Sequence, residues 1–238
     1  LMIKFLKIYR GLKLIILNAI HFRLILVGLK LSFLLLTNIL TKFLFLKLKN
    51  RIITNNFFDY TKKFRLSRNY FKHNPPIWFE IFKKNNLLNK DINILEIGSF
   101  EGMSVLFFDK YLKVKNLYSV DFKKNENFLH NISGLRNINF FNMKSDDFFK
   151  KNLNVNFDII YVDGSHYSVD VFNDLMNSDK LLNKNGILLI DDLLLDVGIR
   201  KNGYKFHEEV MGGVFLFFKK KKNYKFLYTG HQLILKKI

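Results

Sequence analysis

The residues best suited to chemistry begin in the stretch ILEIGSFEGMS at positions 94–104, where an acid and two glycines follow an apolar run. Glu96 is that acid, and Gly98 and Gly102 stand four residues apart before a predicted helix. Glycine tolerates positive φ and has no Cβ, so a turn of this kind lets the backbone approach a ligand closely. The helix start beyond it offers unpaired N–H groups. The stretch predicts either a ligand-binding loop or a glycine-rich bend.

Further carboxylates follow the later apolar runs. Asp121 ends SVD, Asp163 ends FDIIYVD, and Asp191 and Asp192 end GILLIDD. Near-continuous apolar strands are typical of a parallel sheet that is covered on both faces, and such sheets bind ligands beyond the carboxyl ends of their strands. We therefore expect these acids to gather with Glu96 on one rim, where they need a cation, a hydroxyl-rich ligand, or both.

The elements that must position these residues alternate between strand and helix from residue 91 onward. We predict strands near 92–97, 116–121, 137–142, 157–163, 186–191, 224–228 and 231–236. We predict helices near 102–112, 124–133, 145–151, 168–182 and 205–220. This alternation predicts an α/β fold: a Rossmann-like, seven-stranded, mainly parallel sheet with helices on both faces.

Charge divides the 238-residue chain into two predicted domains. Residues 1–90 carry 18 Lys and Arg against two acids, whereas residues 91–238 carry 21 against 18. We therefore predict a basic, α-helical N-terminal arm over 1–90 and an α/β domain over 91–238. Pro75 and Pro76 predict a break before a short helix over 78–86. The chain has no cysteine, which excludes disulfides, thiolate metal sites and cysteine nucleophiles.

The basic arm predicts an anionic partner, either nucleic acid or a membrane surface. Residues 1–54 contain ten Lys and Arg and no acid, which predicts about two amphipathic helices. Lys30 interrupts the longest apolar span, 24–41, and this disfavours a transmembrane helix. Three alternatives stay open: the helices pack on the chain's own domain, they form a targeting peptide, or they dock on RNA, a membrane surface or a larger assembly. Aromatic and basic residues interleave between Phe57 and Lys72, where they could stack on bases or form a buried face.

Four motifs in order, ILEIGSFEGMS, SVD, FDIIYVDGSH and LLNKNGILLIDD, resemble the class I S-adenosylmethionine-dependent methyltransferases. The similarity is to the small-molecule O-methyltransferase group that includes cephalosporin hydroxylase-like and macrocin-type enzymes. It covers roughly residues 91–238, and the closing TGHQLILKKI resembles the last strand of that group.

The resemblance implies an S-adenosylmethionine site. Gly98 and Gly102 would let the loop pass under the methionine part of the cofactor, and Glu96 would hold its amino group directly or through water. The implied cofactor-binding residues are Glu96, Gly98, Ser99, Gly102, Ser104, Asp121, Ser145 and Asp146.

Three of these residues have a stated alternative role. Asp121 would accept both ribose hydroxyls, but it could also be a turn or helix-capping acid. Ser145 and Asp146 would lie near the adenine, although they equally suit a helix N-cap. The cofactor reading of these residues follows from the resemblance.

The resemblance also implies a metal site. In metal-dependent relatives, acids at these strand ends bind a divalent cation, which would here be held by Asp163, Asp191 and Asp192. Hard oxygen ligands select Mg²⁺ or Ca²⁺, and Mg²⁺ could acidify a substrate hydroxyl. Alternatively, one acid binds the cofactor and the others cap the next helix or loop. His166 could act with Asp163 as a catalytic residue, as general base or substrate-orienting group, or it could cap the next helix.

We therefore expect an S-adenosylmethionine-dependent methyltransferase that transfers a methyl group to a small-molecule hydroxyl with metal assistance. The alternative is a methyltransferase-like structural subunit of an organellar (mitochondrial) ribosome or other ribonucleoprotein, with the arm bound to rRNA. The composition, rich in Asn, Lys, Ile and Phe with two prolines, is typical of an A+T-rich genome such as an organellar one. A third possibility is a monotopic enzyme with residues 1–54 on anionic lipid.

Overall fold

The computed structural model describes residues 49–151, 153–193 and 209–238. The predicted helices before residue 49, the span 24–41 and the loop after residue 193 lie outside these ranges. The helices are α3 (Lys49–Thr61), α4 (Asn74–Lys84), α5 (Met103–Tyr111), α6 (Glu126–Ile132), α7 (Ser145–Phe149), α8 (Ser168–Leu181) and α9 (Val210–Lys220). The strands are β1 (Asp91–Ile97), β2 (Lys113–Asp121), β3 (Ile138–Asn142), β4 (Phe157–Val162), β5 (Leu182–Ile190), β6 (Tyr224–Thr229) and β7 (Leu233–Lys237).

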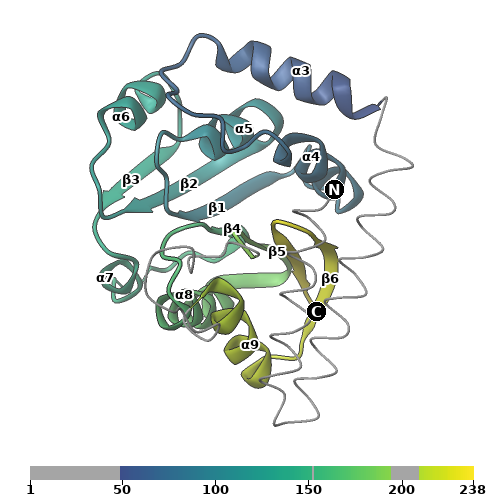
Figure 1. Ribbon diagram of the computed structural model, residues 1–238, viewed down its shortest axis with the longest axis vertical. Helices are drawn as coiled ribbons and strands as arrows, with labels where there is room; N and C mark the ends of the chain where they lie inside the picture. Colours follow the sequence, from purple (N-terminus) through teal and green to yellow (C-terminus); the bar gives the residue numbers. More distant parts are fainter. Residues whose placement is uncertain (1–48, 152, 194–208) are drawn as a thin grey trace, which may run out of the picture.

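The strands form one seven-stranded sheet in the order β3-β2-β1-β4-β5-β7-β6 (Figure 1). Strands β1 to β5 pair in parallel, and β7 runs antiparallel to both β5 and β6. The predicted Rossmann-like, mainly parallel fold is confirmed. The carboxyl ends of β1, β2, β4 and β5 consequently share one edge of the sheet, and β7 begins at that edge.

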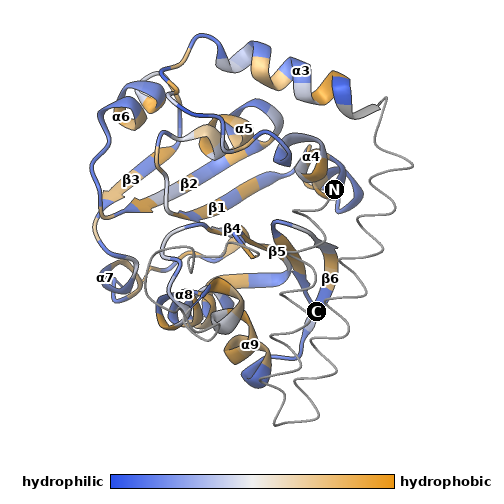
Figure 2. Cartoon of the chain, in the orientation of Figure 1, coloured by the Kyte–Doolittle hydropathy of each residue, from blue (hydrophilic) through white to orange (hydrophobic). Residues whose placement is uncertain are grey.

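Helices cover both faces of the sheet. Helices α3 to α6 lie on one side and α7 to α9 on the other (Figure 1). Two hydrophobic clusters fill these layers, one around Trp78 and Phe108 and the other around Leu175 and Phe217. Figure 2 shows α9 as mostly hydrophobic with a hydrophilic last turn, where Lys219 and Lys220 lie. The central strands β1, β4 and β5 are buried over most of their length, which is why they are largely apolar.

The predicted break at Pro75 and Pro76 is in fact the first turn of α4. Proline is tolerated there because the first N–H groups of a helix lack intrahelical partners in any case. Strands β2 and β5 also begin three to four residues before their predicted starts, at Lys113 and Leu182. The first residues of both strands include charged and polar side chains, so the apolar pattern used to predict strands did not include them.

The described end of the N-terminal segment packs against the sheet domain. Phe57 and Trp78 are fully buried, and their rings lie 5.5 Å from the ring of Phe107. For Phe57 and Phe71 the buried-face interpretation is therefore correct, whereas Tyr70 is exposed. The domain boundary at residue 90 stays a prediction. Among the residues that the structure describes, no helix combines the length and apolarity needed to cross a bilayer.

Candidate active site

The glycine loop, residues 98–102, connects β1 to α5. Gly98 and Gly102 have φ values of 88° and 82°, which suit glycine and strain other residues. A Cβ on Gly98 would lie 2.1 Å from the carbonyl oxygen of Asp163. The N–H of Asp163 also donates to the carbonyl of Ile97 at 2.8 Å. The end of β4 thus lies directly against the loop, and only glycine fits at position 98.

The Asp121 carboxylate at the end of β2 holds the loop from the other side. Its Oδ2 accepts the backbone N–H groups of Ser99 at 3.0 Å and Phe100 at 3.2 Å, and its Oδ1 accepts that of Lys123 at 2.8 Å. These bonds make Asp121 a turn acid, as the alternative interpretation proposed. They leave carboxylate lone pairs for a ligand, since each oxygen can accept more than one hydrogen bond.

Glu96 lies beneath the loop with no exposed surface. The Ser104 hydroxyl donates to its Oε1, and the Ser119 hydroxyl donates to its Oε2 at 2.7 Å. Burial raises the pKa of Glu96 to about 7, although the two serine bonds act in the opposite direction. Glu96 therefore ties β1 to β2 and to the first turn of α5.

Ser145 and Asp146 begin α7, next to the end of β3. The N-cap of α7 is Lys144, so the alternative assignment of Ser145 as N-cap is wrong. The pKa of Asp174 in α8 is raised to about 7, chiefly by burial, and the nearby Ser145 side chain acts in the opposite direction. Asp146 lies in the first turn of α7.

Tyr161 joins two of the predicted metal ligands. Its hydroxyl contacts Oδ2 of Asp163 at 2.8 Å and also Oδ2 of Asp191. Burial raises the pKa of both carboxyls, and their mutual repulsion raises that of Asp163 further. Because a phenol has a single hydrogen to donate, the Tyr161 hydroxyl cannot fully satisfy both carboxylates at once. The two acids thus form a site that favours added positive charge.

Asp192 lies between two histidines. Its Oδ2 is 3.0 Å from Nε2 of His166, and its Oδ1 is 2.8 Å from Nε2 of His231. Burial alone would raise the pKa of Asp192, but the hydrogen bonds from the two imidazoles lower it below its usual range. The N-cap of α8 is Tyr167, so the alternative role of His166 as a helix cap is wrong.

The structure brings the predicted triplet Asp163, Asp191 and Asp192 to one edge together with His166. Ligand atoms of Asp163, His166 and Asp192 lie within 4.8 Å of one another, and so do those of Asp191, Asp192 and His231. The predicted acids and His166 therefore converge as expected, and His231 joins them.

Four residues of this cluster had not been singled out from the sequence: Trp78, Tyr161, His231 and Gln232. The Trp78 indole N–H donates to Oε1 of Gln232 at 2.7 Å, and Nε2 of Gln232 donates to Asp191 at 2.8 Å. Tyr161 stands two residues before Asp163 and so shares its strand face, which is the one signal that could have revealed it. The others come from segments far from residue 163 in the sequence. His231 and Gln232 lie in the closing TGHQLILKKI, whose resemblance to the last strand of the group could have pointed to them.

Comparison with known proteins agrees with this geometry. Residues 95–193 match the model of a family described as a methyltransferase domain. An uncharacterized protein of Acanthamoeba polyphaga mimivirus is 29% identical over 147 residues, which are 56% of this chain and 66% of that protein. The chain thus spans slightly less than two thirds of this relative.

Solved structures show the same fold. The MycE methyltransferase from the mycinamycin biosynthetic pathway, in complex with Mg, SAH and mycinamycin VI, has a TM-score of 0.56 at 15% identity. The match covers 78% of this chain and 53% of the MycE chain. The O-methyltransferase from Bacillus cereus, in complex with SAH, has a TM-score of 0.52 at 12% identity. This match covers 87% of this chain and 99% of the Bacillus cereus chain. The resemblance to class I methyltransferases is confirmed, and the chain has the fold of S-adenosylmethionine-dependent O-methyltransferases.

Proposed function

We propose that this chain is an S-adenosylmethionine-dependent methyltransferase that methylates a hydroxyl of a small molecule with the help of a divalent cation. The observation that carries the proposal is the backbone contact between Gly98 and Asp163. It puts the glycine loop, which would hold the cofactor, directly beside the carboxylate and imidazole cluster, which would hold the acceptor. Methyl transfer needs this adjacency because the acceptor oxygen must approach the methyl carbon in line.

The cofactor would lie over the glycine loop. Ser99 supports this placement: its hydroxyl is buried and has no hydrogen-bond partner among the described residues. A ligand in the loop would provide that partner, since buried polar groups are rarely left unpaired. Asp121 would accept a ribose hydroxyl with its remaining lone pairs, and Glu96 would act by holding Ser104 in place. Ser145 and Asp146 would border the adenine.

The donor set fits a divalent cation. Asp163, Asp191 and Asp192 supply the carboxylate oxygens that Mg²⁺ prefers. Two of these carboxylates face the single hydroxyl hydrogen of Tyr161, so a cation would find unbalanced negative charge there. When bound, the metal would act as a Lewis acid that lowers the pKa of the acceptor hydroxyl. MycE was solved with Mg, which supports this part of the proposal by analogy.

The side chains of the cluster would handle the proton. As the acceptor oxygen bonds to the methyl carbon, the carbon–sulfur bond breaks and its electron pair stays on sulfur, giving S-adenosylhomocysteine. The hydroxyl proton would pass to the ring nitrogen of His166 that does not face Asp192. Asp192 would then stabilise the imidazolium, since it already lies 3.0 Å from the ring.

Calorimetric titration with S-adenosylhomocysteine tests the cofactor site. We expect wild type to bind and Asp121→Asn to bind at least about tenfold more weakly, because the loop N–H groups and the ribose lose a charged acceptor. Asp91→Asn is the matched control, since Asp91 is an exposed acid at the opposite end of β1. Wild type that gives no binding heat, or equal affinity of the two variants, would contradict the proposal.

Titration with Mn²⁺, followed by the electron paramagnetic resonance signal of the free ion, tests the metal site separately. We expect saturable binding in wild type and Asp91→Asn, and a large loss in Asp191→Asn, which removes one charge from the cluster. Binding that survives Asp191→Asn would refute the metal site and leave the cofactor site standing. The predicted arm partner, RNA or a membrane, concerns residues mostly outside the described ranges and stays a prediction.

A further inference from the structure

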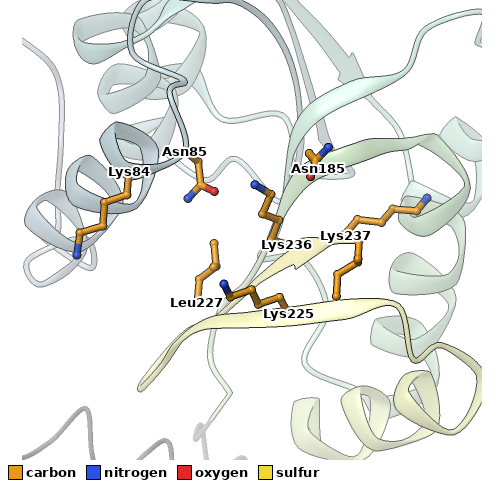
Figure 3. Close-up of a pocket in the computed structure, with 8 residues that line it drawn as sticks. Lys84, Asn85, Asn185, Lys225, Leu227, Lys236 and Lys237 are labelled. Atoms are coloured by element: carbon orange, nitrogen blue, oxygen red, sulfur yellow. The ribbon is translucent and has the colours of Figure 1, made fainter.

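A basic hollow lies at the far end of the sheet, between the end of α4 and the strand pair β6–β7. Its volume is about 440 Å³, comparable with small-molecule pockets. Its lining residues are Lys84, Asn85, Asn185, Lys225, Leu227, Lys236, Lys237 and Ile238. In Figure 3 the amino groups of Lys225 and Lys236 point into the hollow, beside Asn85 and Leu227, whereas Lys84 lies at the rim and points away. None of the lining side chains is acidic.

Within the part of the chain that the structure describes, the two inward lysines have no neutralising partner. Lys225 and Lys236 form no ion pair among the described residues. Lys237 differs from them because its Nζ donates hydrogen bonds to the backbone carbonyls of Asp179 and Leu182. The Asp179 carboxylate itself is taken by Lys221, 2.5 Å away, and by the hydroxyl of Tyr224. Residues 210–238 contain seven lysines and no acid at all. Among the described residues, no side chain neutralises the positive charge that Lys225 and Lys236 bring to the hollow.

The register of the strands makes this charge costly to the protein. Lys225 and Lys236 are direct cross-strand partners in the antiparallel pair β6–β7, so they lie on the same face. Like charges directly opposite each other destabilise a sheet, whereas an acid at either position would stabilise it. A bound anion between the two ammonium groups would offset the repulsion.

We infer that this hollow binds the phosphate backbone of a single-stranded nucleic acid. Two lysines side by side suit consecutive phosphates, and the amides of Asn85 and Asn185 can donate to phosphate oxygens. No aromatic side chain lines the hollow, so bases have nothing to stack on, and contacts to phosphates alone carry no sequence information. A concave site fits a strand better than the plane of a lipid surface.

Fluorescence anisotropy of a labelled single-stranded RNA of mixed sequence tests the inference with the full-length protein. We expect the affinity to fall as salt rises, and the double variant Lys225→Gln/Lys236→Gln to lower the slope of log K against log salt by about 1.4. The matched control is Lys115→Gln/Lys151→Gln, which removes two exposed lysines elsewhere and should keep the wild-type slope. Affinity for S-adenosylhomocysteine should be unchanged in both variants.

A single substitution separates loss of folding from loss of the site. Lys225→Glu places opposite charges across β6–β7, so it should raise the melting temperature while weakening RNA binding about tenfold. The inference is overturned if the double variant Lys225→Gln/Lys236→Gln and the control variant lose RNA affinity equally. It is overturned as well if the double variant keeps wild-type affinity. It is also overturned if RNA does not bind and anionic phosphatidylserine vesicles bind through these lysines instead.

Discussion

The glycine loop is fastened to the segment before the domain by one buried carboxylate, and replacing it tests how the loop is held. Glu101 is 4% exposed. Its Oε2 accepts the backbone N–H of Ser67 at 2.7 Å, and its Oε1 accepts the Asn127 amide at 2.9 Å. Burial acts to raise the pKa of Glu101, but these bonds lower it below its usual value of 4.5. The perturbation is Glu101→Gln, which keeps the shape and removes the charge.

The expected cost follows from these bonds. Hydrogen bonds to a charged group contribute about 1.5–3 kcal/mol each, against about 0.5–1.5 kcal/mol for neutral ones. The glutamine amide also turns its own N–H groups toward one of the two donors, which leaves that donor unpaired at about 1–3 kcal/mol. We expect Glu101→Gln to lower the free energy of unfolding by about 2–4 kcal/mol near neutral pH.

Urea unfolding followed by the emission of Trp78, the sole tryptophan of the chain, measures this cost. The control is Glu126→Gln, which changes an acid whose side chain is 81% exposed. Because the folded-state pKa of Glu101 is depressed, its stabilisation is present above pH 4.5 and is lost as pH falls through the folded pKa. The wild type and variant should converge at low pH. A cost below about 0.5 kcal/mol at pH 7, or one equal to the control, would refute the reasoning.

Three further changes have defined outcomes. Burial raises the pKa of Glu96 from 4.5 to about 7, so this group should make stability fall as pH rises through this window, by up to about 3 kcal/mol. Asp174, whose pKa is raised to the same value, contributes in the same window. Glu96→Gln should therefore reduce the slope of the urea midpoint against pH, and an unchanged slope would contradict the assignment. Gly98→Ala should lower the free energy of unfolding, measured in urea, by about 2–5 kcal/mol, because the new Cβ would collide with the Asp163 carbonyl and because φ is positive there. An unchanged urea midpoint would refute the contact. Trp78→Phe leaves Gln232 Oε1 without its donor. Thermal unfolding followed by circular dichroism should therefore show a free energy of unfolding that is lower by about 1–3 kcal/mol. An unchanged melting temperature would count against that bond.

The fold could be predicted from the sequence because its central strands are apolar on both faces. The runs that contain Leu95, Ile160 and Leu188 are fully buried, and each was predicted within a few residues. The predicted strand limits are wrong where tertiary structure puts polar residues into a strand. Lys113 and Asn183 lie in strands despite being polar, because the ends of a sheet face solvent. The antiparallel placement of β7 between β5 and β6 also depends on contacts far apart in the sequence.

The site could be predicted in part, and the limit is again distance along the chain. Asp163, Asp191 and Asp192 each follow a strand, so strand periodicity alone puts them on one edge. His231 and Gln232 reach the same edge only because β7 begins there, which no local pattern encodes. The hydrogen bonds that occupy Asp121 were equally hidden, since they depend on the conformation of the loop it contacts.

Strand β7 links the acidic edge to the basic hollow, and its length decides whether the two can influence each other. His231 precedes the strand beside Asp192, and Lys236 lies five residues later, paired with Lys225. At about 3.4 Å per residue the two ends are roughly 17 Å apart. This exceeds the screening length of about 8 Å at physiological ionic strength. Neutralising the lysines should therefore leave Mn²⁺ affinity at the carboxylates unchanged, whereas a change of severalfold would mean that the two sites are coupled through the strand.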